Sequence, residues 1–274
     1  DPYVSAYATF EDMLSHRSGL YTASGDLLED LGYDRAYILA HLDQQPLDSF
    51  RSSYNYSNFG YTVGGEAAAV AAGAAWEDLA EDILFKPLGM TRSSFRHADY
   101  MAHENRARIH AIGKDAAGPA WVAKYERDPD AEAPAGSASA SINDVARYLR
   151  LQLDEGRFDG KAVIDADALA VTHMPHMIPS LPRTQTSRTG FYGLGWNVRY
   201  GELGQVAIGH SGAFYLGAAT NINLLLGEGL GIAALTNAAP IGVAEAITND
   251  FLDIVRNGAP TVDWLGFYGM VFQS

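Results

Sequence analysis

The hydrophobic pattern of this sequence changes near residue 191, and the change limits the folds that the chain can adopt. Before that point, polar capping residues precede stretches with helical spacing, as at Thr9–Asp12 and Ser141–Asp144. After it, short apolar runs alternate with glycine-rich turns, and a helical stretch at 243–256 follows them. We therefore predict an α+β protein with a mostly helical region at about 9–190, followed by an antiparallel sheet and a C-terminal helix at about 191–258.

The predicted sheet has three or four strands that short turns connect. Turns of hairpin length are Gly201-Glu202-Leu203-Gly204 and Gly227-Glu228-Gly229. The strands are expected at Leu194–Tyr200, Val206–His210, Ala218–Leu226 and Gly231–Thr236. No internal repeat or low-complexity linker interrupts the chain, so we predict a single domain over residues 1–274.

Composition excludes several classes of function. The formal net charge of −14 argues against nucleic acid or an anionic membrane as partner. No apolar run reaches the length of a membrane span, and the absence of cysteine excludes thiol catalysis. The histidines of His173-Met174-Pro175-His176 lie on either side of a proline with no carboxylate nearby in sequence, so we expect neither a metal nor another cofactor. Without an initiator Met, the chain is expected to be a processed or trimmed product.

The stretch Tyr54–Tyr61 carries polar groups suited to chemistry. If Asn58 caps a helix that begins near Phe59, then Tyr56 lies in a fixed loop at a helix N-terminus. A tyrosine in such a loop can exchange a proton with a nearby hydroxyl, and an asparagine can bind a substrate amide as both donor and acceptor. The alternative is a tyrosine that packs on the core and an asparagine that only caps.

Five motifs occur in the order that one family uses. They are Leu14-Ser15-His16-Arg17-Ser18-Gly19-Leu20, Tyr56-Ser57-Asn58, Pro87-Leu88-Gly89-Met90, Tyr192-Gly193-Leu194-Gly195-Trp196 and His210-Ser211-Gly212. Together they resemble the serine β-lactamase and penicillin-binding-protein superfamily, in the branch of class C β-lactamases, D-amino-acid peptidases and related esterases. The resemblance extends from Asp1 to about Gly258, and implies a periplasmic or secreted location.

The resemblance also implies roles for individual residues. Tyr56 would transfer protons beside a nucleophilic serine, and Asn58 would bind the substrate's amide. His210 would stand where the family often has lysine, and would act on the Tyr56 proton and the negative end of the substrate. The substrate would also lie against Ser211, Gly212 and Ala213, with the backbone N–H of Ala213 in the oxyanion hole.

The family's Ser-x-x-Lys motif is missing. The residues three positions before the lysines Lys86, Lys114, Lys124 and Lys161 are Ile83, Ala111, Trp121 and Phe158. In one explanation the chain is a fragment, and the motif lies on an N-terminal segment that was cleaved, is disordered or belongs to a separate polypeptide. In the other explanation the protein is a relative without a nucleophile. We favour the fragment because Tyr56, Asn58 and His210 are retained.

Two functions follow from this interpretation. The first is a serine hydrolase that forms an acyl-enzyme with an ester, a D-amino-acid peptide or a β-lactam, its serine lying outside this chain. This chain alone would then be inactive. The second is a non-catalytic module whose cleft binds a peptide or a cell-wall fragment.

Overall fold

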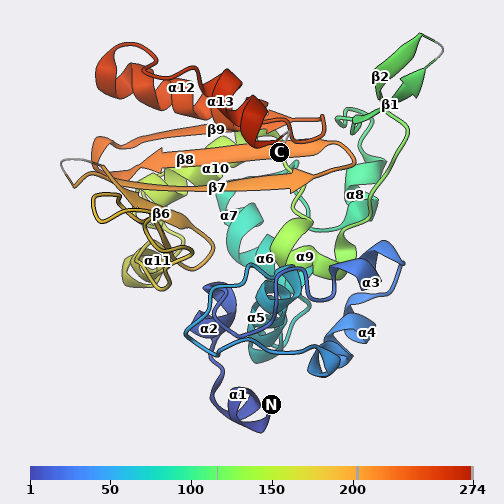
Figure 1. The fold of residues 1–274 in the computed structure, drawn as a ribbon. Helices are drawn as coiled ribbons and strands as arrows, with labels where there is room; N and C mark the ends of the chain where they lie inside the picture. The colour runs from blue at the N-terminus through green and yellow to red at the C-terminus, as the bar shows by residue number, and fades with distance from the viewer. Residues whose placement is uncertain (116, 202–203, 273–274) are drawn as a thin grey trace. The chain divides into compact units, whose positions relative to one another are not determined.

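The computed structural model describes residues 1–115, 117–201 and 204–272 of the chain. These residues form two compact units (Figure 1). Unit 1 comprises residues 1–102 and 128–208, and unit 2 comprises residues 103–127 and 209–274. Antiparallel strands and packed helices together confirm the predicted α+β class.

Unit 1 is mainly helical. Its α-helices are α1 (Pro2–Tyr7), α2 (Phe10–Leu14), α3 (Asp26–Asp30), α4 (Arg35–Ala40), α5 (Asn58–Ala72), α6 (Trp76–Ala80), α7 (Lys86–Leu88), α8 (His97–Ala102), α9 (Ala133–Gly136), α10 (Ile142–Leu153) and α11 (Ala166–Thr172). A π-helical turn, Glu81–Phe85, joins α6 to α7. The short strands β3 (Arg157–Phe158) and β4 (Lys161–Ala162) pair with each other, and β5 (Phe191–Tyr192) pairs antiparallel with β6 (Asn197–Tyr200).

Unit 2 contains the longer strands. β7 (Val206–Phe214) begins in unit 1 and continues into unit 2, where β8 (Ala218–Leu225) lies between it and β9 (Leu230–Thr236). β8 and β9 are antiparallel, with Ala219 opposite Thr236 and Leu225 opposite Leu230. A separate hairpin consists of β1 (Ala111–Asp115) and β2 (Gly118–Val122). The helices α12 (Val243–Asn257) and α13 (Trp264–Val271) follow β9, and α12 packs on β8 and β9 (Figure 1).

Most helix starts agree with the sequence prediction. The side chain of Thr9 caps α2 and forms a capping box with Asp12, and the side chain of Asp34 caps α4. Ser141 caps α10, but the Asp144 carboxylate accepts hydrogen bonds from Arg92 N and Ser93 Oγ instead of completing a capping box.

The predicted cap of α5 was wrong by one residue. Ser57 is the N-cap, and its Oγ accepts a hydrogen bond from Gly60 N at 3.0 Å. Asn58 is the first residue of the helix. Serine and asparagine are about equally good caps, so local preference cannot choose between adjacent candidates.

Other differences concern elements with weak periodicity. The segment 92–140, whose helical periodicity is poor, contains α8 and α9. α13 was not predicted. β7 runs four residues beyond His210, to Phe214. The turn predicted at 201–204 includes residues 202 and 203, which lie outside the described part of the chain, whereas Gly229 turns the chain between β8 and β9 in the left-handed conformation. In the part of the chain that the structure describes, no helix is both long and apolar enough to cross a membrane.

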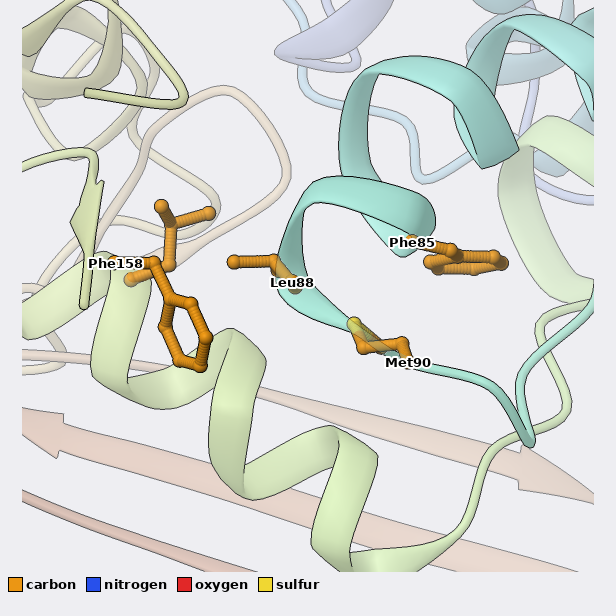
Figure 2. Packing of buried hydrophobic residues seen from close by; sticks show 5 residues of the cluster. Phe85, Leu88, Met90 and Phe158 are labelled. Carbon is orange, nitrogen blue, oxygen red and sulfur yellow. The ribbon is translucent and has the colours of Figure 1, made fainter. Parts of the chain in front are cut away.

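One apolar cluster of unit 1 joins its central helices. Leu88 from α7 lies between Phe158 on one side and Phe85 and Met90 on the other (Figure 2). Leu151 of α10 completes the cluster, and both leucines are fully buried. Pro87-Leu88-Gly89-Met90, one of the five motifs, therefore has a packing role, and Gly89 turns the chain in the left-handed conformation, with φ of 63°.

Replacing Leu88 by alanine is expected to lower the free energy of unfolding by about 2–5 kcal/mol, because it opens a cavity in a buried cluster. Urea denaturation followed by circular dichroism measures this loss. Ile83→Ala is the matched control, since the Ile83 side chain is 58% exposed. Equal losses in the two variants would contradict the packing role.

Candidate active site

The predicted site residues fall into two groups. Tyr56 and Asn58 belong to unit 1, whereas His210, Ser211, Gly212 and Ala213 belong to unit 2. The first group lies on a loop that leads into α5, and the second lies on β7.

Tyr56 lies directly before the capping residue of α5. Its side chain is 36% exposed. Burial of the rest of the side chain raises the pKa of Tyr56 to about 12, and electrostatic interaction with Tyr61, Glu132 and Asp26 raises it further. With a pKa of about 12, the phenol is neutral at physiological pH. Tyr56 in these surroundings is a proton donor, and it needs a nearby positive charge before it can act as a base.

Asn58 has a fixed orientation. Its Nδ2 donates a hydrogen bond to Asp26 Oδ2 at 3.2 Å. Because a carboxylate only accepts hydrogen bonds, the amide nitrogen must face Asp26, and this defines the orientation of the side-chain oxygen. The arrangement gives Asn58 a preset geometry for binding an amide N–H through its oxygen.

Asp12, which has no exposed surface, joins the segment that follows α2 to the segment that leads into this loop. Arg17 Nε lies 2.7 Å from Asp12 Oδ1, and Arg51 Nη2 lies 2.9 Å from Asp12 Oδ2. The backbone N–H of Arg51 also donates to the carbonyl oxygen of Arg17. Burial alone would raise the pKa of Asp12, but hydrogen bonds from Arg51, Arg17 and Thr9 hold it well below its usual range.

On β7, the exposure of the site residues changes along the strand. His210 is half-buried, and Ser211, Gly212 and Ala213 are exposed. Burial lowers the pKa of His210, although its hydrogen bond with the backbone of Ser211 acts in the opposite direction. His210 is therefore a neutral hydrogen-bonding group at physiological pH and a poor source of positive charge.

A buried polar network holds Ser211 in place. Asn221 Nδ2 lies 2.6 Å from Ser211 Oγ, and Asn221 Oδ1 accepts hydrogen bonds from Asn223 and from Thr248 of α12. Asn223 and Thr248 are 1% and 0% exposed. The hydroxyl of Ser211 is thus the exposed end of a chain of buried hydrogen bonds.

Gly212 has a packing reason to be glycine. A Cβ at this position would lie 2.9 Å from Oγ1 of Thr220, across the strand pair. The sequence analysis attributed this glycine to space for substrate, and the contact with Thr220 is a second, independent constraint.

The two histidines considered for a metal have other partners. His173 Nε2 lies 2.8 Å from Gln152 Oε1, and His176 Nδ1 lies 2.8 Å from Glu11 Oε1. Glu11 is distant in sequence, so inspection of neighbouring residues could not reveal it. Among the described residues, no group of three His, Cys, Asp or Glu side chains is arranged to hold a metal ion.

Sequence reasoning assigned no role in the site to three residues that shape it, namely His16, Asp12 and Asp26, and it considered Asp12 only for the capping of α2. His16 and its neighbour Arg17 belong to the first of the five motifs, and this membership was the available signal. Asp26 gave none, because its contact with Asn58 joins residues that are 32 positions apart.

Comparison with known proteins identifies the family. The beta-lactamase family model matches residues 3–255, and the chain belongs to this family. Penicillin-binding protein 4 of Amycolatopsis lactamdurans is 28% identical over 264 residues, which are 93% of this chain and 65% of the relative.

Two solved structures support the same fold. The octameric penicillin-binding protein homologue from Pyrococcus abyssi matches with a TM-score of 0.74 and 19% identity, over 92% of this chain and 56% of that one. The D-amino acid amidase from Ochrobactrum anthropi SV3 matches with a TM-score of 0.68 and 21% identity, over 91% of this chain and 73% of that one. The chain thus spans less than two thirds of the length of its curated relative and of the Pyrococcus homologue.

The Asp12 ion pairs predict a defined pH dependence of stability. A carboxyl whose pKa is depressed by folding stabilises the protein above its unfolded pKa, about 3.9, and this contribution is lost as the pH falls below that value. Asp12→Asn should lower the free energy of unfolding at pH 7 by about 3–5 kcal/mol. In this variant, the free energy of unfolding should also decrease less than in the wild type when the pH is lowered from about 5 to about 3. Urea titrations across this range test the expectation, with the exposed Asp43→Asn as control. An unchanged pH dependence in Asp12→Asn would contradict it.

Because the Asp26 carboxylate raises the pKa of Tyr56, we expect its removal to lower that pKa. Asp26→Asn removes the negative charge but keeps an oxygen that can accept from Asn58, so the pKa of Tyr56 should fall while the loop is retained. Ultraviolet difference titration measures this pKa, with Tyr56→Phe identifying the signal. Asp167→Asn, at an exposed position of α11, should leave the titration unchanged. A Tyr56 pKa that does not respond to Asp26→Asn would show that the carboxylate has no influence.

Proposed function

We propose that this chain supplies the proton-transfer and substrate-binding residues of a serine hydrolase, and that the nucleophilic serine lies outside these 274 residues. The fixed loop Tyr56-Ser57-Asn58, in a member of the beta-lactamase family, is the observation that carries the proposal. In this proposal the residues belong to one catalytic domain, and this chain alone is inactive.

In the proposed reaction, a nearby cation holds Tyr56 as the phenolate, and the serine oxygen attacks the carbonyl carbon of an ester or amide while its proton passes to that phenolate oxygen. Tyr56 then donates a proton to the leaving alcohol or amine, and an acyl-enzyme remains. Water, deprotonated by the same group, attacks the acyl-enzyme and releases the acid. Asn58 binds the amide of the substrate, and the N–H of Ala213 stabilises the negative carbonyl oxygen.

The raised pKa of Tyr56 supports the proposal that a cation from outside these 274 residues takes part in proton transfer. A phenol with a pKa near 12 is a poor base at pH 7, and each cation brought close to it would lower that value. A Ser-x-x-Lys segment would supply the nucleophile and such a cation together.

The charge around Tyr56 bears on the choice of substrate. Asp26 and Glu132 both act on its pKa as negative charges. Such a field attracts a substrate amine and repels a substrate carboxylate. This favours peptides or amides of D-amino acids over β-lactams, and the Ochrobactrum relative is named as a D-amino acid amidase. Simple esters, which are neutral, would rank between these two classes.

The test uses the native polypeptide that contains these residues. A fluorophosphonate probe should add once, to a serine outside residues 1–274, as located by intact-mass spectrometry and peptide mapping. Tyr56→Phe should lower kcat/KM by about 10²–10⁴-fold on the best substrate from a panel of D-amino acid amides, esters and β-lactams. Asn257→Ala, an exposed change at the end of α12, is the control.

Each alternative has its own outcome. A probe adduct on a serine within residues 1–274 would refute an external nucleophile. Binding of a peptide or cell-wall fragment without probe labelling or turnover would instead support a non-catalytic module.

A further inference from the structure

His16 has an unusual backbone conformation. It lies just after α2, its side chain is buried, and its φ is 57°. Non-glycine residues seldom adopt this left-handed conformation, and they keep it only where the surrounding structure holds them there. The contacts of His16 show what that conformation provides.

His16 binds the chain on both sides of Tyr56. The backbone N–H of Asn55 donates to the carbonyl oxygen of His16 at 3.0 Å. The backbone N–H of Ser57 donates to Nδ1 of the imidazole at 3.2 Å. Tyr56 is the single residue between these two attachments, so its backbone is fixed by one residue that is forty positions away in sequence.

The imidazole also packs against the ring of Tyr56. The two ring centroids are 4.3 Å apart, and the planes are inclined by 39°. The other ring nitrogen, Nε2, lies 3.2 Å from the hydroxyl oxygen of Tyr192, which is 1% exposed. Because Nδ1 accepts from Ser57, the hydrogen of the neutral ring must be on Nε2, which then donates to Tyr192.

We propose that His16 is a positioning residue for Tyr56. Its Nε2–H tautomer holds the two backbone groups beside Tyr56 and supports the phenol ring, so that the phenol oxygen keeps one place relative to the substrate. The consequence for catalysis rests on the proposed function, whereas the attachment of the loop does not. The alternative is a histidine that only fills the core, for which the acceptor at Nδ1 would be unimportant.

Two substitutions separate these roles. In His16→Asn, the side-chain oxygen can take the place of Nδ1 as acceptor from Ser57, and asparagine tolerates a positive φ. In His16→Gln, the amide reaches towards the position of Nε2, but no acceptor remains at the position of Nδ1. His16→Gln therefore keeps more of the side-chain length but loses the hydrogen bond from the Ser57 N–H. His16→Asn shortens the side chain but keeps that hydrogen bond.

The first readout is nuclear magnetic resonance of the 274-residue chain. In the wild type, long-range ¹H–¹⁵N correlation should show that Nδ1 of His16 lacks the proton and that Nε2 carries it. Hydrogen exchange at the Ser57 amide should accelerate at least about tenfold in His16→Gln and change less than about threefold in His16→Asn. Gly113 in β1 of unit 2 is the internal reference, because its exchange should be the same in all three proteins.

The second readout is kinetic, on the native polypeptide. His16→Gln should lower kcat at least about tenfold with a smaller effect on KM, and His16→Asn should restore most of kcat. A proton on Nδ1 in the wild type, or equal Ser57 exchange in the two variants, would overturn the proposal, and the wild-type measurement decides even if His16→Gln fails to fold. If the exchange results are as expected but the native polypeptide shows no turnover, the attachment stands and the proposed function fails.

Discussion

The buried carboxylate of Asp12 joins the segments on which the site of unit 1 depends. Asp12 is fully buried, and it binds Arg17 from its own segment and Arg51 from the segment that leads to Tyr56. A buried charge is tolerated only when it is paired and hydrogen-bonded, so neither arginine can leave without a large loss of stability. The pairing places the residues after α2 beside the Tyr56 loop, and the contacts of His16 with Asn55 and Ser57 follow from that placement.

Both groups of candidate site residues follow one principle, in which an accessible polar group is attached to a buried polar framework. In unit 1, Tyr56 lies between residues that bind His16, and Asn58 is oriented by Asp26. In unit 2, the exposed Ser211 is bound to Asn221, which belongs to a network that includes the buried Thr248. Such support fixes a side chain before substrate arrives, which is what proton transfer and substrate orientation require.

The electrostatics of the described residues keep the titratable groups of the candidate site neutral. Burial and nearby carboxylates raise the pKa of Tyr56, and burial lowers the pKa of His210 in unit 2. Both shifts favour neutral side chains at physiological pH. A neutral phenol needs a nearby positive charge before it can act as a base.

The sequence by itself determined the α+β class, most helix starts and the family, because capping residues, alternating strands and short motifs act over a few neighbouring positions. It could not choose between Ser57 and Asn58 as the cap of α5, since both are good caps and the choice depends on how the loop enters the helix. It also missed the contacts of Asp12, Asp26 and His16. Those contacts join residues 39, 41 and 32 positions apart. Buried polar groups must be paired, and only the tertiary structure decides which distant groups meet.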